Sequence, residues 1–447
     1  MTEARAPRID WWRIAGGKTL LERPRFSRML LARLLALIGQ NALLYAMLVL
    51  LVENTGSSIS TGVFLLSFAI PAAALGPVSG VVIDRFPRSL LLAAMNILRV
   101  FICVGLLISG DSAWTLYLFA LALSATMQFV GPAESASLPQ LVEQGEITQA
   151  GSLFNLTSLI GQAAGLGILA PIALNTIGAD PLFVVSGALF AVAAVAIATV
   201  PGLGMPSAMS TARIHTPGVR NEFARAWQAL QRDEQAYLAT VMQIVGNLSL
   251  LVAVALLPRF AEDELNISVT NMVFVFWPAV IGIFVGLRLA GWISRVIGQG
   301  HAMTLGFVLL VLSLVAFGLV GDLAGLLERV NILGISDPGP IYGRGARVVI
   351  AMVTSVFAGF AYSLVGVVGR AIINERIPLE MQGRVFAAVN VLTNLSSVIP
   401  LLVAGALADL LGVRPVILMV CVLVSAFIVW FVLRERTVRP LRGGLHG

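Results

Sequence analysis

Hydrophobic and polar positions alternate along this chain in long blocks. Apolar runs of about 20 residues recur, and each is long enough to cross the ~30 Å hydrocarbon core of a bilayer as a helix. We predict twelve such spans, six on each side of the longest interior break. They cover roughly residues 28–52, 60–83, 89–109, 113–133, 148–174, 181–200, 236–258, 270–293, 302–321, 347–369, 384–410 and 414–433. The pattern predicts an all-α membrane protein.

The predicted spans divide the chain into five segments. Residues 28–200 form an N-terminal six-helix bundle and residues 236–433 a C-terminal one, flanked by basic tails at 1–27 and 434–447. Residues 201–235 link the two bundles. In this linker Val219, Phe223, Trp227 and Leu230 recur at helical spacing beside arginines. The spacing predicts an amphipathic helix, which either rests on the lipid interface or packs on the underside of the protein.

A sequence pattern repeats about half a chain apart. Residues 131–155 and 369–394 each begin with a glycine that ends an apolar run. A proline and a second glycine follow, and then a new apolar run that contains asparagine. Such an echo in a membrane protein indicates two related halves, here two pseudo-symmetric bundles, with a substrate path between them. The repeat therefore favours a transporter.

Composition supports the membrane assignment and sets the orientation. The chain is 58% hydrophobic and 12% charged, whereas soluble proteins are about a quarter charged. With both termini in the cytoplasm, 22 of the 29 lysine and arginine residues fall on the cytoplasmic side and five outside, as the positive-inside rule requires. We therefore attribute the net charge of +6 to the orientation of the chain in the membrane rather than to nucleic-acid binding. We expect a multi-pass protein of the cytoplasmic (inner) membrane that contacts membrane lipids.

The chain shows no sign of a catalytic or metal centre. The two cysteines lie in apolar runs, the three histidines lie outside them, and they form no His/Cys cluster. We find no HExxH or GxSxG motif and no pair of aspartates in mid-membrane. We expect no enzyme activity, no cofactor and no metal.

A polar motif joins spans 2 and 3 at the predicted cytoplasmic side. Gly80, Asp84, Arg85 and Arg88 follow the spacing G-x-x-x-D-R-x-x-R. An aspartate can cap a helix N-terminus and the arginines can pair with carboxylates, so the motif predicts a breakable latch between the halves. The alternative is that these arginines form no latch and only follow the positive-inside rule for cytoplasmic loops. We assign Gly383 and Arg384, which open span 11, to the same cytoplasmic gate.

This motif, the twelve spans and the half-chain repeat resemble the major facilitator superfamily. The segments Asn96–Arg99, Gly131–Ala133, Gln382–Val385 and Ala404–Asp409 resemble its drug-efflux branch, which includes macrolide exporters and the enterobactin exporter. The resemblance implies the major facilitator fold, a monomer, alternating access and proton-coupled antiport. It also implies a central cavity lined by spans 1, 4, 7 and 10.

The expected cavity contains neutral polar and aromatic side chains. We predict that it is lined by Gln40, Asn41, Tyr45, Gln128, Gln243, Asn247, Tyr362 and Asn390. Asn155 and Asn394 are able to join them, and about half of the set is expected to form interhelical hydrogen bonds instead. A neutral polar cavity with apolar walls suits small amphipathic or lipophilic substrates.

Charged residues inside the spans are rare. Arg99 lies about eleven residues into span 3 and must face the protein interior or water, in a gating or a structural role. Arg33 is nearer the cytoplasmic end, where it can snorkel. All 23 aspartates and glutamates are predicted in loops or near span ends, so we name Asp84, Glu53 and Asp409 as the possible groups for proton coupling.

These features predict a secondary active transporter that exports small amphipathic or lipophilic compounds, a multidrug-type efflux antiporter with the proton as coupling ion. Two alternatives stay open. A lipid or lysolipid flippase would fit the neutral cavity and the absence of a mid-membrane carboxylate. The second alternative is a membrane receptor that transports nothing. The predicted cytoplasmic latch argues against it, because a latch is useful only in a protein that opens.

Overall fold

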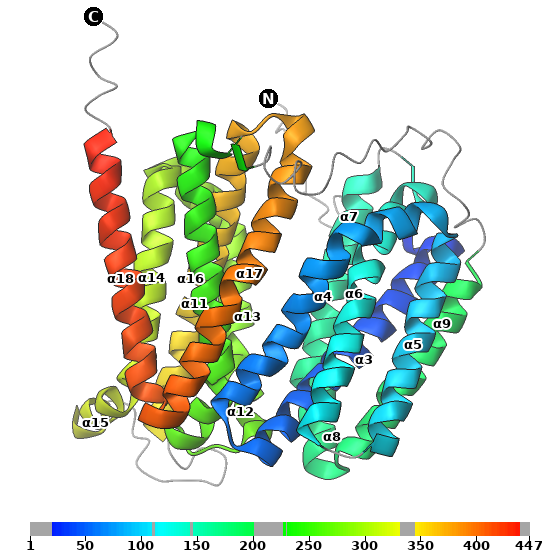
Figure 1. Cartoon of the computed structure of the whole chain (residues 1–447), viewed down its shortest axis with the longest axis horizontal. Helices are drawn as coiled ribbons and strands as arrows, with labels where there is room; N and C mark the ends of the chain where they lie inside the picture. The colour runs from blue at the N-terminus through cyan, green and yellow to red at the C-terminus, as the bar shows by residue number, and fades with distance from the viewer. Residues whose placement is uncertain are drawn as a thin grey trace, which may run out of the picture. The chain divides into compact units, whose positions relative to one another are not determined.

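The computed structural model describes residues 20–109, 112–143, 146–200, 227–228, 230–330 and 345–438. All regular elements in these ranges are helices (Figure 1). The contacts between residues divide the chain into two units. The first unit contains residues 1–50 and 70–214, and the second contains residues 51–69 and 215–447.

The first unit contains six membrane-length segments. They are α3 (Pro24–Thr55), α4 (Ser58–Arg85), α5 (Arg88–Ser109), α6 (Ala113–Leu141), the segment formed by α7 (Ile147–Ala164), η2 (Gly165–Leu169) and α8 (Ala170–Thr176), and α9 (Ala179–Ala198). Residues 51–69 are grouped with the second unit. They form the last turn of α3, the short connection after it and the first turns of α4. Helix α5 packs along α6 and α9. The π-helical turn η2 interrupts its segment just before Pro171, which lacks the N–H that a regular helix needs.

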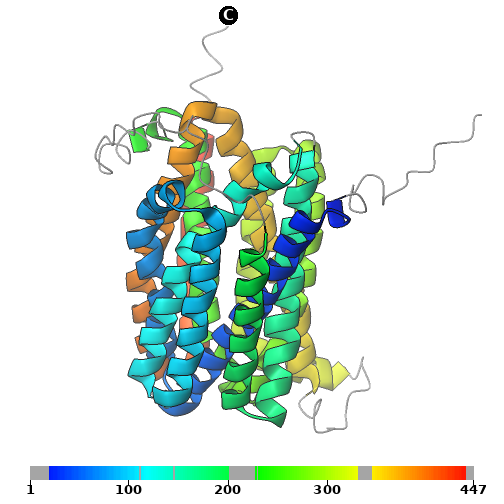
Figure 2. The ribbon, with the colours of Figure 1, turned by 90° about the vertical axis from the view of Figure 1, so that its right-hand side faces the viewer.

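The second unit has the same number of long segments. They are α11 (Glu234–Asp263), the segment formed by η4 (Val269–Asn271), α12 (Met272–Phe276) and α13 (Pro278–Ile297), then α14 (Gln299–Gly318), α16 (Gly345–Arg376), α17 (Leu379–Leu411) and α18 (Val413–Val438), with the short α15 (Val320–Val330) after α14. Helix α16 packs along α11, α13 and α14. The helices of this unit run side by side along their length (Figures 1 and 2).

Eleven helical segments of the described residues are long and apolar enough to cross a membrane, and α18 adds a shorter apolar stretch at Val413–Val429. The all-α membrane class predicted from the sequence is thereby confirmed. Many of the helices extend beyond the predicted spans. Helix α6 continues through Pro132 and Pro139 to Leu141, and α16 continues to Arg376 rather than ending near residue 369.

Glycines set the breaks between consecutive helices at matching places in the two halves. Gly178 precedes α9 and Gly412 precedes α18, and both have φ +87°. Because side chains disfavour this left-handed region, glycine is the residue that can reverse the chain there without strain. The two turns occupy equivalent places in the half-chain repeat, before the sixth and the twelfth segment.

The described end of the linker packs on the second unit. Leu230 is fully buried with Ile373, Ile377 and Val385, and Trp227 contacts the Tyr237 ring with centroids 5.7 Å apart. For these residues the packing favours the underside of the protein over the lipid interface. Val219 and Phe223 lie outside the described residues.

Candidate functional site

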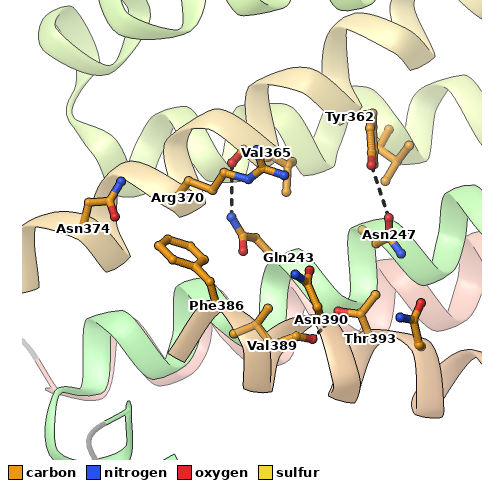
Figure 3. Close-up of a pocket in the computed structure, with 14 residues that line it drawn as sticks. Gln243, Asn247, Tyr362, Val365, Arg370, Asn374, Phe386, Val389, Asn390 and Thr393 are labelled. Carbon is orange, nitrogen blue, oxygen red and sulfur yellow. Dashed lines mark hydrogen bonds between the residues drawn. The ribbon is translucent and has the colours of Figure 1, made fainter. Parts of the chain in front are cut away.

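The second unit contains a pocket of about 630 Å³ between α11, α16 and α17 (Figure 3). This volume lies in the usual range of small-molecule sites, roughly 300–1,000 Å³. The pocket is lined by Gln243, Gly246, Asn247, Leu310, Tyr362, Val365, Gly366, Arg370, Asn374, Phe386, Val389, Asn390, Thr393 and Asn394. Its wall therefore combines amide side chains, two aromatic rings, aliphatic surface and one arginine.

Glycines on α16 make room for this pocket. A Cβ atom at Gly369 would lie 2.6 Å from Nε2 of Gln243, so only glycine lets Gln243 lie against the helix there. The same side chain donates a hydrogen bond of 3.1 Å to the carbonyl oxygen of Gly366. At Gly366 itself a Cβ atom would meet no described atom within 4 Å, because that position faces open space.

Among the polar side chains that line the pocket, Gln243, Asn247, Tyr362 and Thr393 form hydrogen bonds with described residues, and three asparagine amides do not. The Tyr362 hydroxyl donates to Oδ1 of Asn247 at 3.2 Å, which joins α16 to α11 (Figure 3). The amide groups of Asn374, Asn390 and Asn394 form no hydrogen bond with the described residues, and those of Asn374 and Asn390 are exposed. These amides are available to donate to, and accept from, a bound molecule.

Arg370 carries the only formal charge among the described residues that line the pocket. It lies six residues before the end of α16, about 9 Å along the helix axis. Its side chain is exposed and has no hydrogen-bond or ion-pair partner within the described part of the chain. The sequence predicted a neutral cavity, and Arg370 adds a positive charge to the lining of this pocket.

The eight predicted cavity residues fall into two groups. Four of them, Gln243, Asn247, Tyr362 and Asn390, line the pocket, and Asn394 does as well. The other four belong to the first unit. Gln40 and Tyr45 are buried, while Asn41 and Gln128 donate to carbonyl oxygens of their own helices, those of Leu37 and Ser124. Asn155 is exposed on α7.

The first unit contains a buried ion pair that the sequence did not reveal. Glu134 on α6 is only 4% exposed and pairs with Arg33 on α3. Arg33 also donates to the Ser158 hydroxyl at 2.8 Å and lies over the Phe154 ring, 4.8 Å from its centroid. Arg33 is therefore not a snorkelling residue, and Glu134 is not a loop carboxylate. The prediction failed because it ended span 4 at residue 133, whereas α6 continues to Leu141.

Arg99 is another cation inside the first unit, and it is more buried than Arg33, whose side chain is 15% exposed. It is 1% exposed, donates from Nε to the Thr126 hydroxyl at 2.8 Å and lies over the Phe190 ring at 5.5 Å. Its Nη2 and the Asn96 Oδ1 have no partner in the described residues, and no described carboxylate pairs with it. The expectation that Arg99 faces the protein interior agrees with this packing.

Only part of the predicted cytoplasmic gate is described. Arg88 donates to the Ala136 carbonyl oxygen at 2.5 Å, which ties the start of α5 to α6. Arg85 and Gly80 are exposed, and no described atom lies within 4 Å of a Cβ atom built on Gly80. The side chains of Asp84 and Arg384, and the surroundings of Gly383, lie outside the described residues. The latch therefore stays a prediction.

The two remaining candidates for proton coupling lie together in the second unit. Asp409 accepts hydrogen bonds from the Ser57 hydroxyl at 2.6 Å and the Ser58 backbone N–H at 2.8 Å, and it pairs with Arg259 at 2.5 Å. It thus caps the first turn of α4. Glu53 is exposed and accepts from the Thr270 hydroxyl at 3.4 Å. Their role in coupling stays untested. Among the described residues, no three His, Cys, Asp or Glu side chains are grouped so as to hold a metal ion.

Comparison with known sequences gives a consistent result. The family model of the Major Facilitator Superfamily matches residues 29–337. An uncharacterized MFS-type transporter of Bacillus subtilis (strain 168), YfiS, is 24% identical over 366 residues, which is 80% of this chain and 80% of that protein. The macrolide efflux protein A of Streptococcus pyogenes is 23% identical over 403 residues, 85% of this chain and 88% of that protein.

Solved structures with a similar fold are also transporters. The nucleoside transporter NupG has a TM-score of 0.69 at 13% identity, over 91% of this chain and 98% of that one. A bacterial homolog of the human lysosomal transporter Spinster, in an inward-facing and unoccupied conformation, has a TM-score of 0.68 at 14% identity, over 93% and 98%. At these identities the likeness concerns the fold alone.

Proposed function

The chain belongs to the Major Facilitator Superfamily, and from that premise we propose that it exports small amphipathic compounds by proton-coupled alternating access. It is an integral membrane transporter with the fold that the sequence predicted. The substrate, the direction of transport, the coupling ion, the cytoplasmic-membrane location and the cytoplasmic termini are parts of the proposal.

The pocket of the second unit carries the proposal. It offers about 630 Å³ of space, amide groups that have no described partner, and apolar surface from Leu310, Val365, Phe386 and Val389. A ligand with a polar group and an apolar body finds a complement to both there. Export rather than import is supported by the 23% identity with a macrolide efflux protein over 85% of this chain.

The buried ion pair of the first unit supports proton coupling. A carboxylate inside a membrane-spanning helix is costly unless it is paired, and such residues commonly belong to ion pathways. Glu134 is the one glutamate or aspartate among the described residues that is buried. When Glu134 binds a proton its charge is lost, and Arg33 keeps only the Ser158 hydroxyl and the Phe154 ring as described contacts.

In this account a proton from outside neutralises Glu134 while the site faces outward. The loss of the ion pair then favours repacking of α3 against α6, and release of the proton to the cytoplasm restores the pair. Substrate leaves the second-unit pocket in the opposite direction. The cycle needs only that the two conformations differ in their affinity for the proton and for the substrate.

Dye accumulation in bacteria without their own efflux pumps tests the proposal. The cells express the full chain or carry an empty vector, and they receive anionic, neutral and cationic fluorescent compounds and a macrolide. We expect lower accumulation of at least one compound in the expressing cells, and we expect a protonophore to reverse it. If no compound changes, the export proposal is wrong. If only a labelled lysolipid moves, and it still moves with protonophore, the flippase alternative replaces it.

A further inference from the structure

We propose that Arg370 selects substrates that carry an anionic group, so that the pocket takes organic acids with an apolar or aromatic body. The inference deepens the proposed function because it names the substrate class of the same pocket. Binding itself does not depend on the direction of transport or on proton coupling.

The first step is that Arg370 has no ion-pair or hydrogen-bond partner among the described residues. Four other described arginines near helix ends have a carboxylate partner. Arg23 pairs with Glu143 and Glu146, Arg259 with Asp263 and Asp409, and Arg414 with Asp322. Six residues beyond Arg370 on the same helix, Arg376 pairs with Asp233 and donates to Gln235. Arg370 has no such partner in the described residues, and none of the described residues that line its pocket is acidic.

The second step is the position of the guanidinium group. Arg370 enters the pocket from α16, and Phe386 and Asn390 enter it from α17 (Figure 3). An arginine offers a planar fork of N–H donors that matches two oxygens of a carboxylate, sulfonate or phosphate group. The positive charge is thus directed at space that a ligand can occupy rather than at a protein carboxylate.

The third step is that neighbouring amides complete an anion site. The amide groups of Asn374, Asn390 and Asn394 line the same pocket without described partners. Their N–H groups can donate to the ligand oxygens that Arg370 leaves free. A carboxylate accepts several hydrogen bonds, so one guanidinium with two or three amides is a sufficient set.

The fourth step concerns the rest of the ligand. Phe386, Val389, Leu310 and Val365 supply apolar surface in the same pocket. This surface suits an aromatic or aliphatic body attached to the acid group, and a small inorganic anion would leave it uncovered. A cation would meet the charge of Arg370 with no carboxylate among the described lining residues to offset it. The predicted order of affinity is therefore anion, then neutral compound, then cation.

Two dyes with the same three-ring core provide the test. Fluorescein is an anion and rhodamine 123 is a cation, and their affinities for the purified full chain are measured by fluorescence anisotropy. We expect the wild type to bind fluorescein more tightly than rhodamine 123. Because a hydrogen bond to a charged group contributes about 1.5–3 kcal/mol, we expect Arg370→Gln to weaken fluorescein binding about tenfold to a hundredfold and to leave rhodamine 123 unchanged or tighter.

Two further variants keep the result interpretable. Arg370→Lys keeps the charge but loses the fork, and we expect it to retain part of the affinity for fluorescein. Arg376→Gln removes the same charge from the same helix outside the pocket, and we expect no change in dye binding. Size-exclusion chromatography shows which variants are folded. If Arg370→Gln is misfolded, the affinity of Arg370→Lys for fluorescein is compared with that of the wild type instead.

The anion has two possible sources, a soluble organic acid or the phosphate of a lysolipid. Displacement of fluorescein by lysophosphatidate but not by benzoate or naphthoate would assign the lipid source, and the reverse result would assign the organic acid. Equal affinity of the wild type for the two dyes, or fluorescein binding that Arg370→Gln does not weaken, would overturn the inference.

The inference and the proposed function fail in different ways. Fluorescein binding through Arg370 without any flux would leave the anion site standing and remove the exporter. Uphill export of rhodamine 123 that Arg370→Gln does not alter, without fluorescein binding, would leave the exporter standing and remove the anion site.

Discussion

The two units of this transporter use polar residues in opposite ways. The first unit buries its charges: Arg33 and Glu134 pair inside the protein, and Arg99 is 1% exposed against Thr126 and Phe190. The second unit leaves amides and one arginine without described partners around a pocket of about 630 Å³. A buried ion pair is lost when its carboxylate binds a proton, whereas polar groups without partners around a cavity can bind a ligand. On this contrast rests our proposal that the first unit couples to the proton and the second binds the substrate.

The largest expected effect comes from breaking the buried pair. Glu134→Ala leaves Arg33 buried without its carboxylate, and loss of one partner of such a pair costs about 3–5 kcal/mol. We expect a much lower melting temperature in detergent and no uphill transport. The double variant Arg33→Met, Glu134→Leu removes both charges, so it should regain most of the stability and none of the coupling. Uphill transport by the double variant would refute the coupling role of the pair.

The next effect concerns the shape of the pocket. Gly369→Ala places a methyl group 2.6 Å from Nε2 of Gln243 and pushes that side chain into the cavity. We expect substrate affinity to fall about tenfold, equivalent to about 1.4 kcal/mol, while stability stays close to wild type. Gly291→Ala on α13 is the control, because Gly291 is not among the residues that line the pocket and a Cβ atom there meets no described atom within 4 Å. If the two variants changed the dye affinity equally in titrations, the position of Gln243 would have no effect on substrate binding.

A smaller effect is expected at Arg99. Thr126→Val removes the one side-chain acceptor that Arg99 has among the described residues, and an unsatisfied buried donor costs about 1–3 kcal/mol. The melting temperature should fall, while the affinity for substrate should stay unchanged. Thr157→Val serves as control, because the Thr157 hydroxyl bonds only to its own helix, at the Leu153 carbonyl oxygen. A loss of substrate binding in Thr126→Val would contradict the proposal that substrate binding depends on the second unit alone.

The smallest effect is expected at the predicted latch. Asp84→Asn keeps the size of the side chain and removes its charge, so we expect uphill transport to slow by about two- to fivefold through a weaker helix cap, worth roughly 0.5–1 kcal/mol. The amount of protein in the membrane should not change. The exposed Asp180 at the start of α9 provides the control Asp180→Asn. Full transport activity of Asp84→Asn would remove the latch from the account.

The sequence predicted the fold well because hydrophobic length is a direct physical requirement of the bilayer. Polar groups inside apolar runs are conspicuous, and four that the sequence singled out line the pocket of the second unit: Gln243, Asn247, Tyr362 and Asn390. Their role in substrate binding stays a prediction. The sequence prediction missed Glu134 and Arg370 for one reason. Apolar runs end where the lipid ends, but helices α6 and α16 continue, and their charged residues face protein or a pocket rather than a loop.

The half-chain repeat shows the same limit. Pro139 and Pro378 occupy matching places in the two copies. In the first copy the helix continues through Pro139 to Leu141, whereas in the second α16 ends at Arg376 and Pro378 precedes α17. Neighbouring helices can satisfy the backbone group that a proline frees, so the tertiary contacts decide which copy breaks. A single sequence does not contain that information.

Transport by proteoliposomes in two modes tests the central claim most directly. Counterflow exchange requires only substrate binding and alternating access, whereas uphill transport also requires proton coupling. With a dye that the wild type carries, we predict that Glu134→Gln retains counterflow and loses uphill transport, and that Gly369→Ala weakens both. Loss of both modes in Glu134→Gln, or uphill transport that persists in it, would contradict the assignment of coupling to the first unit and binding to the second.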